Sequence, residues 1–348
     1  MKANIVLLLL LISITLVSAN ENSTKEFIDG EVLDTRCCYW PGDFLVFRDF
    51  NTFKVKDDIT IESNDAEILP KFKSDKIEKV ELNSCFVICG FCGCSKNDSN
   101  IHNLPIKLNE VFPNLYAYVV KYTKVKRLKH KNFKNLNKLE YLTIEMSLVS
   151  KINDDAFDDL TELKALSLIY NKIHNLSPRL LKNTLKLERI NLQGNKITNI
   201  TKEHFGHLTN LTYLELSINK IQNLDSDVFE TLVNLVELKL YENQILSLPV
   251  GIFDNLAKLE IINLGGNQLT TLDDNIFEHN NELKKIWLSH NKISKLNIKV
   301  FENTRKALII NLQKNICIDH EFGYSTASKP LSQYDINKLK NDLKNKCS

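Results

Sequence analysis

The chain has 348 residues with a formal net charge of +2, and 43% of them are hydrophobic. A charge this close to zero gives no reason to expect a nucleic acid or an anionic membrane as partner, and the apolar content is sufficient for a core.

Residues 1–19 have the features of a secretory signal peptide. Lys2 precedes an apolar run over residues 5–17, and small residues lead up to Ala19, after which we expect cleavage. The run is shorter than the roughly 20 residues that a membrane-spanning helix needs. No later stretch is apolar enough to span a bilayer, so we expect a secreted, extracellular and soluble product.

The secretory route is oxidising, which favours disulfides for the eight cysteines. The cysteine-rich segment 89–94 also invites a metal site, but in an exported protein we expect disulfides there and no metal or cofactor. Pairing is left open for the six cysteines near the front of the chain, Cys37, Cys38, Cys85, Cys89, Cys92 and Cys94. Cys317 and Cys347, near the other end, are expected to pair with each other.

Residues 20–76 show no repeat and are interpreted as an N-terminal, cysteine-bearing cap. Segments 44–47 and 59–61 are predicted to be strands within it. A capping unit of this kind would cover the first open edge of a sheet.

From residue 77 onward the sequence repeats. Residues 187–197 read L-x-x-I-x-L-x-x-N-x-I, the pattern of a leucine-rich repeat. Counting from the first leucine as place 1, the pattern returns every 24 residues. Place 9 is asparagine in seven successive repeats: Asn171, Asn195, Asn219, Asn243, Asn267, Asn291 and Asn315.

The period predicts a stacked architecture. Side chains alternate faces along a strand, so places 4 and 6 point into a core while places 3, 5 and 7 point outward. Stacked copies pair as a parallel sheet. The asparagine amide both donates and accepts, so we expect the place 9 column to bridge successive turns. Place 19 is phenylalanine in most repeats, with Leu181 as the exception, and 24 residues leave room only for short turns or 3₁₀ pieces on the outer side.

The first and last repeats are atypical. The repeat at Ile77 precedes the one at Leu115 by 38 residues, so an insertion of about 87–100 must follow its strand. The repeats at Leu115 and Leu139 have Thr123 and Ser147 in place of asparagine. We assign the repeats to 77–316 and a C-terminal cap to 317–348, with one helix predicted over 331–343.

The stretch from about 77 to 347 resembles the secreted and ectodomain class of leucine-rich repeat proteins. This class includes Toll-type receptor ectodomains, small leucine-rich proteoglycans and the secreted immune leucine-rich proteins of mosquitoes. The resemblance implies an α/β fold: a curved, horseshoe-shaped solenoid with a parallel β-sheet on the concave face, disulfide-bearing caps and a macromolecular ligand. The chain departs from these relatives in having no membrane or signalling segment, two cysteines in its C-terminal cap rather than four, and no coiled coil after the repeats.

No enzyme motif is present: there is no G-x-S-x-G, H-E-x-x-H, P-loop or dinucleotide fingerprint. We interpret His204 and His207 as surface histidines on the outer side. Glu215 and Lys239 share place 5 on neighbouring repeats and are expected to form a surface ion pair of small value. The sequence therefore predicts a protein that is not an enzyme.

The outward strand places carry residue types that are enriched at interface hot spots. Scattered exposed aromatics are the alternative interpretation, and the insertion 87–100 is a competing site. The ligand-binding candidates on the concave face are Tyr141, Tyr170, Arg189, Tyr213, Glu237, Tyr241 and Trp287.

Glycosylation sequons avoid these outward places. They stand at Asn22, Asn97, Asn175, Asn199 and Asn210. Glycans at these positions would leave the concave face open.

The sequence thus favours a secreted recognition protein that binds an extracellular protein or a microbial-surface ligand, in innate defence or signalling. A structural matrix or adhesion protein and an inhibitor of a secreted enzyme remain alternatives. The ligand and the oligomeric state are left open.

Overall fold

The computed structural model describes residues 102–324 and 326–347, except for the side chain of Val111, and the backbone of residues 25–28, 31–34, 52–55 and 79–83. Several sequence expectations lie outside the described residues. They are the signal peptide, the strands at 44–47 and 59–61, the insertion 87–100, the six front cysteines, and the sequons at Asn22 and Asn97.

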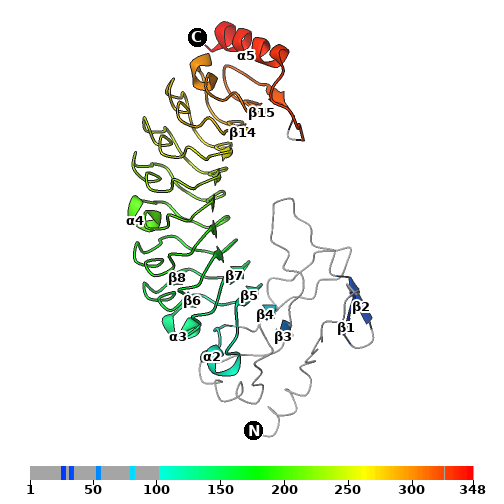
Figure 1. Ribbon diagram of the computed structural model, residues 1–348, viewed down its shortest axis with the longest axis vertical. Helices are drawn as coiled ribbons and strands as arrows, with labels where there is room; N and C mark the ends of the chain where they lie inside the picture. Colours follow the sequence, from blue (N-terminus) through cyan, green and yellow to red (C-terminus); the bar gives the residue numbers. More distant parts are fainter. Residues whose placement is uncertain are drawn as a thin grey trace.

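The described repeats form a curved solenoid whose main strands line its inner side (Figure 1). Twelve strands make one sheet in the order β16-β15-β14-β13-β12-β11-β10-β9-β7-β5-β4-β3. All neighbours in this sheet are parallel except β15 and β16. The bounds of these strands are β3 Thr52–Val55, β4 Lys79–Asn83, β5 Ala117–Lys121, β7 Tyr141–Glu145, β9 Ala165–Ser167, β10 Arg189–Asn191, β11 Tyr213–Glu215, β12 Glu237–Lys239, β13 Ile261–Asn263, β14 Lys285–Trp287, β15 Ile309–Asn311 and β16 Glu321–Gly323.

The remaining elements are short, apart from the last helix. They are the antiparallel pair β1 (Lys25–Ile28) and β2 (Glu31–Asp34), the parallel pair β6 (Arg127–Leu128) and β8 (Lys151–Ile152), the four-residue helices α2 (Leu108–Val111), α3 (His130–Phe133) and α4 (Lys202–Phe205), the 3₁₀ turn η3 (Ile298–Phe301), and α5 (Gln333–Lys346). The expectation of short turns and 3₁₀ pieces on the outer side is confirmed.

The pairing register follows the repeat. Arg189 pairs with Tyr213, and Tyr213 with Glu237, so each place lies beside the same place of the next repeat. Across the longer step, Lys79 of β4 pairs with Ala117 of β5. Places 4 and 6 are fully buried, for example Leu214 and Leu216. The predicted parallel-sheet solenoid is therefore confirmed.

The place 9 asparagines bridge successive repeats as predicted. The Oδ1 atom of Asn219 accepts a hydrogen bond from Ile197 N of the preceding repeat, at 3.0 Å. Its Nδ2 atom donates to Leu192 O of that repeat and to Leu216 O of its own, at 3.1 and 2.9 Å. The other six asparagines repeat this arrangement. In the entry repeats, Ser147 Oγ takes over part of this role by accepting from Thr123 N at 3.1 Å.

Place 8 adopts a positive φ in every described repeat, because the chain turns inward there after the strand. Glycine fits this conformation without steric cost, and Gly194 and Gly266 use it with φ of 70° and 65°. Elsewhere a side chain must tolerate it, including the β-branched Ile218 at φ 57°.

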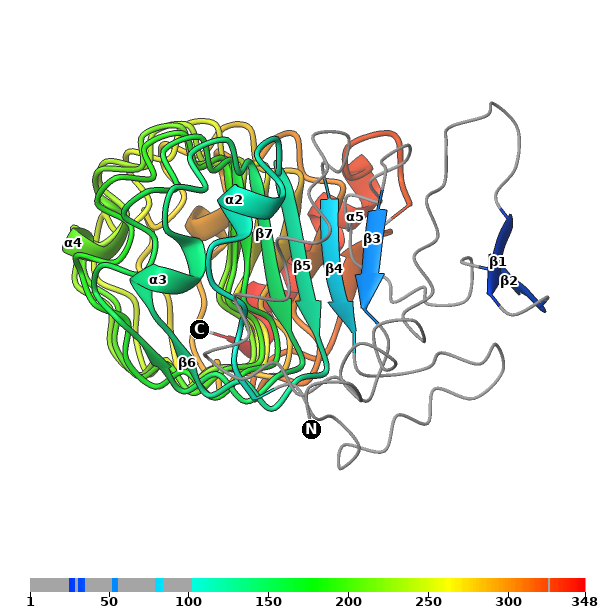
Figure 2. The ribbon, with the colours of Figure 1, turned by 90° about the horizontal axis from the view of Figure 1, so that it is seen from below.

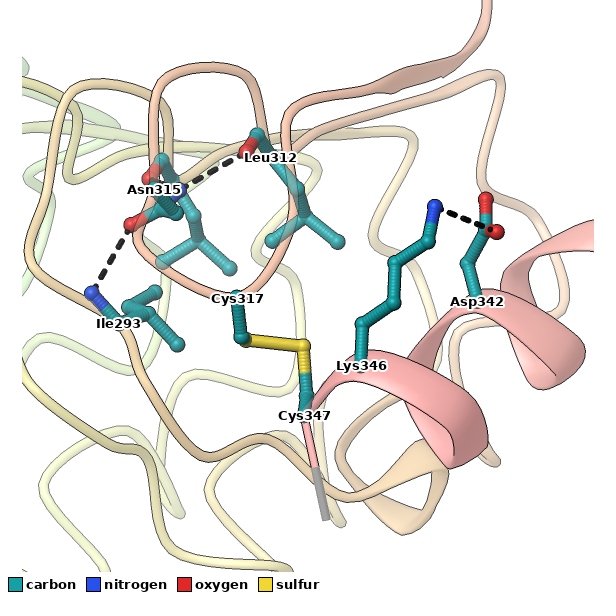
Figure 3. Close-up of a disulfide and its surroundings, with 8 residues drawn as sticks. Ile293, Leu312, Asn315, Cys317, Asp342, Lys346 and Cys347 are labelled. Carbon is teal, nitrogen blue, oxygen red and sulfur yellow. Dashed lines mark hydrogen bonds and ion pairs between the residues drawn. A yellow bond between two sulfur atoms is a disulfide. The ribbon is translucent and has the colours of Figure 1, made fainter.

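Helix α5 closes the C-terminal end (Figure 1). The Ser332 hydroxyl caps its first turn by accepting from Asp335 N, and Leu339 and Leu343 are buried against the last repeat. The helix predicted over 331–343 is therefore present. A disulfide joins Cys317 to Cys347 directly after the helix, close to the hydrogen bonds of Asn315 (Figure 3).

Candidate binding face

The concave face is formed by the side chains at places 3, 5 and 7 of β5 to β15. Of the predicted binding residues, the structure leaves Tyr141, Arg189, Glu237, Tyr241 and Trp287 half-buried. Tyr170, at place 8, is 38% exposed. The remaining candidate, Tyr213 at place 3 of β11, is buried more deeply.

Three of the predicted residues meet in a central cluster, which we define as Arg189, Tyr213, Glu215, Glu237 and Lys239. The guanidinium carbon of Arg189 lies 4.0 Å from the centroid of the Tyr213 ring, and Lys239 Nζ lies 5.2 Å from the same centroid. The Tyr213 ring is thus held by cation–π contacts, which leave it only 8% exposed. Lys239 also forms an ion pair with Glu237 at 2.7 Å.

The expected surface ion pair between Glu215 and Lys239 needs a correction, because Glu215 is buried. Glu215 is only 5% exposed, and its carboxylate lies 3.9 Å from Lys239 Nζ. A closer bond comes from Ser217 N, which donates to Oε1 at 2.8 Å. Burial raises the pKa of the Glu215 carboxyl, while the bonds from Ser217 and the charge of Lys239 oppose the rise. The residue is a buried acid at the floor of the cluster, because the neighbouring side chains cover it.

Place 5 has a structural role that the sequence reasoning missed. After the strand, the backbone N–H at place 7 donates a hydrogen bond to the side chain at place 5, two residues earlier in the chain. Asn191, Asn263 and Asn311 each accept this bond at 3.0 Å, as Glu215 does. Asn191 stands at an outward-pointing place, but its side chain is therefore bonded to the backbone. The available signal was the known ability of Asn side chains to bond a backbone N–H two positions on.

Two other aromatic candidates, Tyr170 and Tyr241, are packed on glycines of the following repeat, whereas Tyr141 contacts Tyr116 edge-on. A Cβ atom built on Gly194 would lie 2.2 Å from the Tyr170 ring, and one on Gly265 would lie 3.2 Å from the Tyr241 ring. Trp287 stands apart, in register between Asn263 and Asn311. The candidates therefore form one central cluster with separate aromatic side chains around it.

The outer side holds no catalytic arrangement among the described residues. His204 is buried rather than on the surface: its ring nitrogens contact Thr201 Oγ1 at 2.9 Å and Leu176 O at 3.1 Å. His207 is half-buried, with Nε2 at 2.9 Å from Leu181 O. A cavity beside His204 has a volume of about 10 Å³, too small for a ligand. The residues that the structure describes contain no cluster of metal-ligating side chains.

The sequons within the described residues are exposed and lie off the concave face. Asn175 and Asn199 occupy place 13, and Asn210 occupies place 24. The Asn210 amide already donates to Leu185 O at 3.1 Å.

Comparison with known proteins identifies the repeats. The leucine rich repeat family model matches in overlapping segments that together span more than half of the chain: 113–173, 140–197, 161–221, 185–245, 209–269 and 234–293. No curated protein sequence matches.

Three solved structures share the fold at low sequence identity. Toll in the Toll–Spätzle complex of Drosophila has a TM-score of 0.60 and 19% identity, with 74% of this chain and 35% of the Toll chain covered. The plant peptide hormone receptor RGFR1 in complex with RGF2 gives 0.54 and 21%, covering 69% and 36%. An internalin from Listeria monocytogenes gives 0.50 and 18%, covering 76% and 74%. The chain thus spans about a third of each of the two receptors.

Two further findings bear on the class of protein. No helix among the described residues has both the length and the apolar character to cross a membrane. Proteins of this repeat family generally serve as protein-interaction scaffolds without catalytic activity. From the repeat match and the 24-residue parallel solenoid, the chain belongs to the leucine-rich repeat family.

Proposed function

We propose that this chain is a secreted, non-enzymatic recognition protein that binds an extracellular protein through its concave face. The solved structures that share its fold include Toll in complex with Spätzle and a plant receptor in complex with the peptide RGF2. A role in extracellular signalling or innate defence fits a protein with this fold and with the signal peptide that the sequence predicts.

The central cluster is the observation that carries this proposal. Arg189, Glu237 and Lys239 present charges of both signs on a rigid parallel sheet, and each is already oriented by a neighbour in the cluster. Because the side chains are ordered before binding, a partner loses little conformational entropy when it docks. A partner that covers these half-buried charges must match their signs, which gives specificity.

The structure changes which substitutions test the proposal best. Tyr213 is covered, so its removal would also uncover Glu215 and disturb the fold. Arg189 and Trp287 are more accessible, and replacing either with alanine leaves the sheet hydrogen bonds in place. We expect Arg189→Ala or Trp287→Ala to weaken binding by about 2 kcal/mol, as hot-spot substitutions do.

The experiment captures partners from extracellular fluid on the immobilised mature chain and then measures the affinity of the purified partner for each variant. Tyr334→Ala is the matched control, because Tyr334 is 74% exposed but lies on α5, away from the concave face. Normal binding by both concave-face variants, together with loss of binding on deletion of 87–100, would place the site in the insertion instead.

A further inference from the structure

The flank of the solenoid where the strands end has an unusual charge distribution. In the eight repeats that begin at Leu115 through Leu283, places 9 to 14 contain no Asp or Glu. Lysine or arginine stands repeatedly at places 10, 12 and 13. We define the basic flank as Lys126, Arg127, Lys151, Lys172, Lys196 and Lys220.

The backbone holds these cations in a column. Lys172 N, Lys196 N and Lys220 N each donate at 2.8 Å to the place 11 carbonyl of the preceding repeat. Nearer the N-terminal end, Arg127 of β6 pairs in register with Lys151 of β8, so two cations stand side by side. Figure 2 shows β6 on the side of the solenoid where the main strands end, set back from the concave sheet. Neighbouring strands are about 4.8 Å apart, so the cations follow one another at short, regular intervals.

Among the described residues, no carboxylate forms an ion pair that would neutralise the positive charge of the basic flank. Lys126, Arg127, Lys151 and Lys172 are all exposed, and the ion pairs between described residues include none of them. Like charges placed opposite each other across a strand pair are destabilising. The basic flank therefore has a positive potential that an external anion would relieve.

The opposite flank differs, although it is equally rich in lysine. There, the lysines at places 24 and 2 meet side chains exactly one repeat earlier in sequence. Four of these six lysines meet a glutamate, and the other two, Lys138 and Lys258, meet an asparagine oxygen. Lys164–Glu140 lies at 2.9 Å, and Lys284–Glu260 at 2.7 Å. Most lysines of the opposite flank are therefore paired with carboxylates, whereas Lys126, Arg127, Lys151 and Lys172 form no ion pair with a described residue.

We propose that the basic flank binds a linear sulfated polysaccharide of the glycosaminoglycan class. The sulfates of such a chain follow one another along an extended backbone, which matches cations that recur on successive turns of the solenoid. A membrane surface fits less well, because no large hydrophobic side chain is exposed at places 10 to 13 of the first three described repeats. A single-stranded nucleic acid would use aromatic stacking platforms, and places 10 to 13 of the eight repeats carry no Phe, Tyr or Trp.

The test measures the affinity of the full secreted chain for immobilised heparin as a function of salt concentration. The flank variant is Lys126→Gln/Arg127→Gln/Lys151→Gln. These cations belong to two repeats whose place 13 carries no sequon, whereas Asn175 and Asn199 stand at place 13 of the next two repeats. The matched control is Lys329→Gln/Lys340→Gln/Lys344→Gln, which removes the same charge from exposed positions of the C-terminal cap. Both variants are first checked for an unchanged melting temperature.

Wild type should bind heparin at about 0.15 M salt, with log Kd depending linearly on log salt. Since each contacting cation releases counterions on binding, the flank variant should reduce the slope by about 3 and the control by less than about 1. Trp287→Ala, on the concave face, should bind heparin as wild type does. The proposal is overturned by absence of heparin binding, by equal losses in the two triple variants, or by tighter flank-dependent binding to phosphatidylserine vesicles or a single-stranded oligonucleotide.

Discussion

Replacing Asn219 with alanine removes one rung of the place 9 column, and the neighbouring bonds determine the cost. Leu192 O and Leu216 O each lose one donor but keep another, from Asn195 and Asn243 respectively. Ile197 N is different, because Asn219 Oδ1 is the acceptor that the structure gives it. One buried N–H is therefore left unpaired, which costs about 1–3 kcal/mol.

The assay is thermal unfolding of the purified chain, followed by circular dichroism. Asn223→Ala in the same repeat is the control, because Asn223 is exposed at place 13. A cost of 1 kcal/mol lowers the Tm of a domain of this size class by roughly 2–4 °C. We expect a fall of that size or larger for Asn219→Ala and almost none for the control. Equal Tm values for the two variants would refute the assignment of the asparagine column as a stabilising element.

Three further predictions concern stability. The double variant Cys317→Ser/Cys347→Ser should lower the free energy of unfolding by about 2–4 kcal/mol, since the disulfide closes a loop with a sequence separation of 30; non-reducing peptide mapping that pairs either cysteine with another one would contradict this. Gly194→Ala should cost about 1–3 kcal/mol in chemical denaturation, because the new Cβ would meet the Tyr170 ring at a positive φ, and an unchanged midpoint would show that the ring moves aside freely. Glu215 has a folded-state pKa above its usual 4.5, so its ionised form opposes folding. Glu215→Gln should therefore be more stable than wild type at neutral pH, with a difference that shrinks as the pH falls through the folded pKa and vanishes below about 4.5; a difference that grows on acidification would contradict the burial argument.

The architecture could be predicted because the repeat imposes it locally. A period of 24 residues fixes the register, so the pairing of Arg189 with Tyr213 followed from the sequence alone. The asparagine column was predictable for the same reason: a residue that recurs at one place must meet its own copies. The burial of places 4 and 6 followed from strand alternation.

The candidate site was less predictable, because its burial depends on contacts between particular side chains. Alternation placed Tyr213 and Glu215 on the outward face correctly, but it did not show that Arg189 and Lys239 would cover them. His204 was misplaced for a similar reason. Its burial depends on a carbonyl in the preceding repeat, Leu176 O, which no local pattern reveals.

The antiparallel strand β16 has a consequence for how the molecule behaves in concentrated solution. Every other strand from β3 to β15 runs parallel to its neighbours, so an open last strand would offer a template for a second solenoid to continue the stack. Instead β16 occupies that position in the opposite direction, and α5 packs against it. At Gly323 the backbone approaches Leu308 O so closely that a Cβ atom would lie 2.0 Å away. The edge that remains at this end is therefore only three residues long and of opposite polarity, which disfavours continuation of the parallel stack by a second copy.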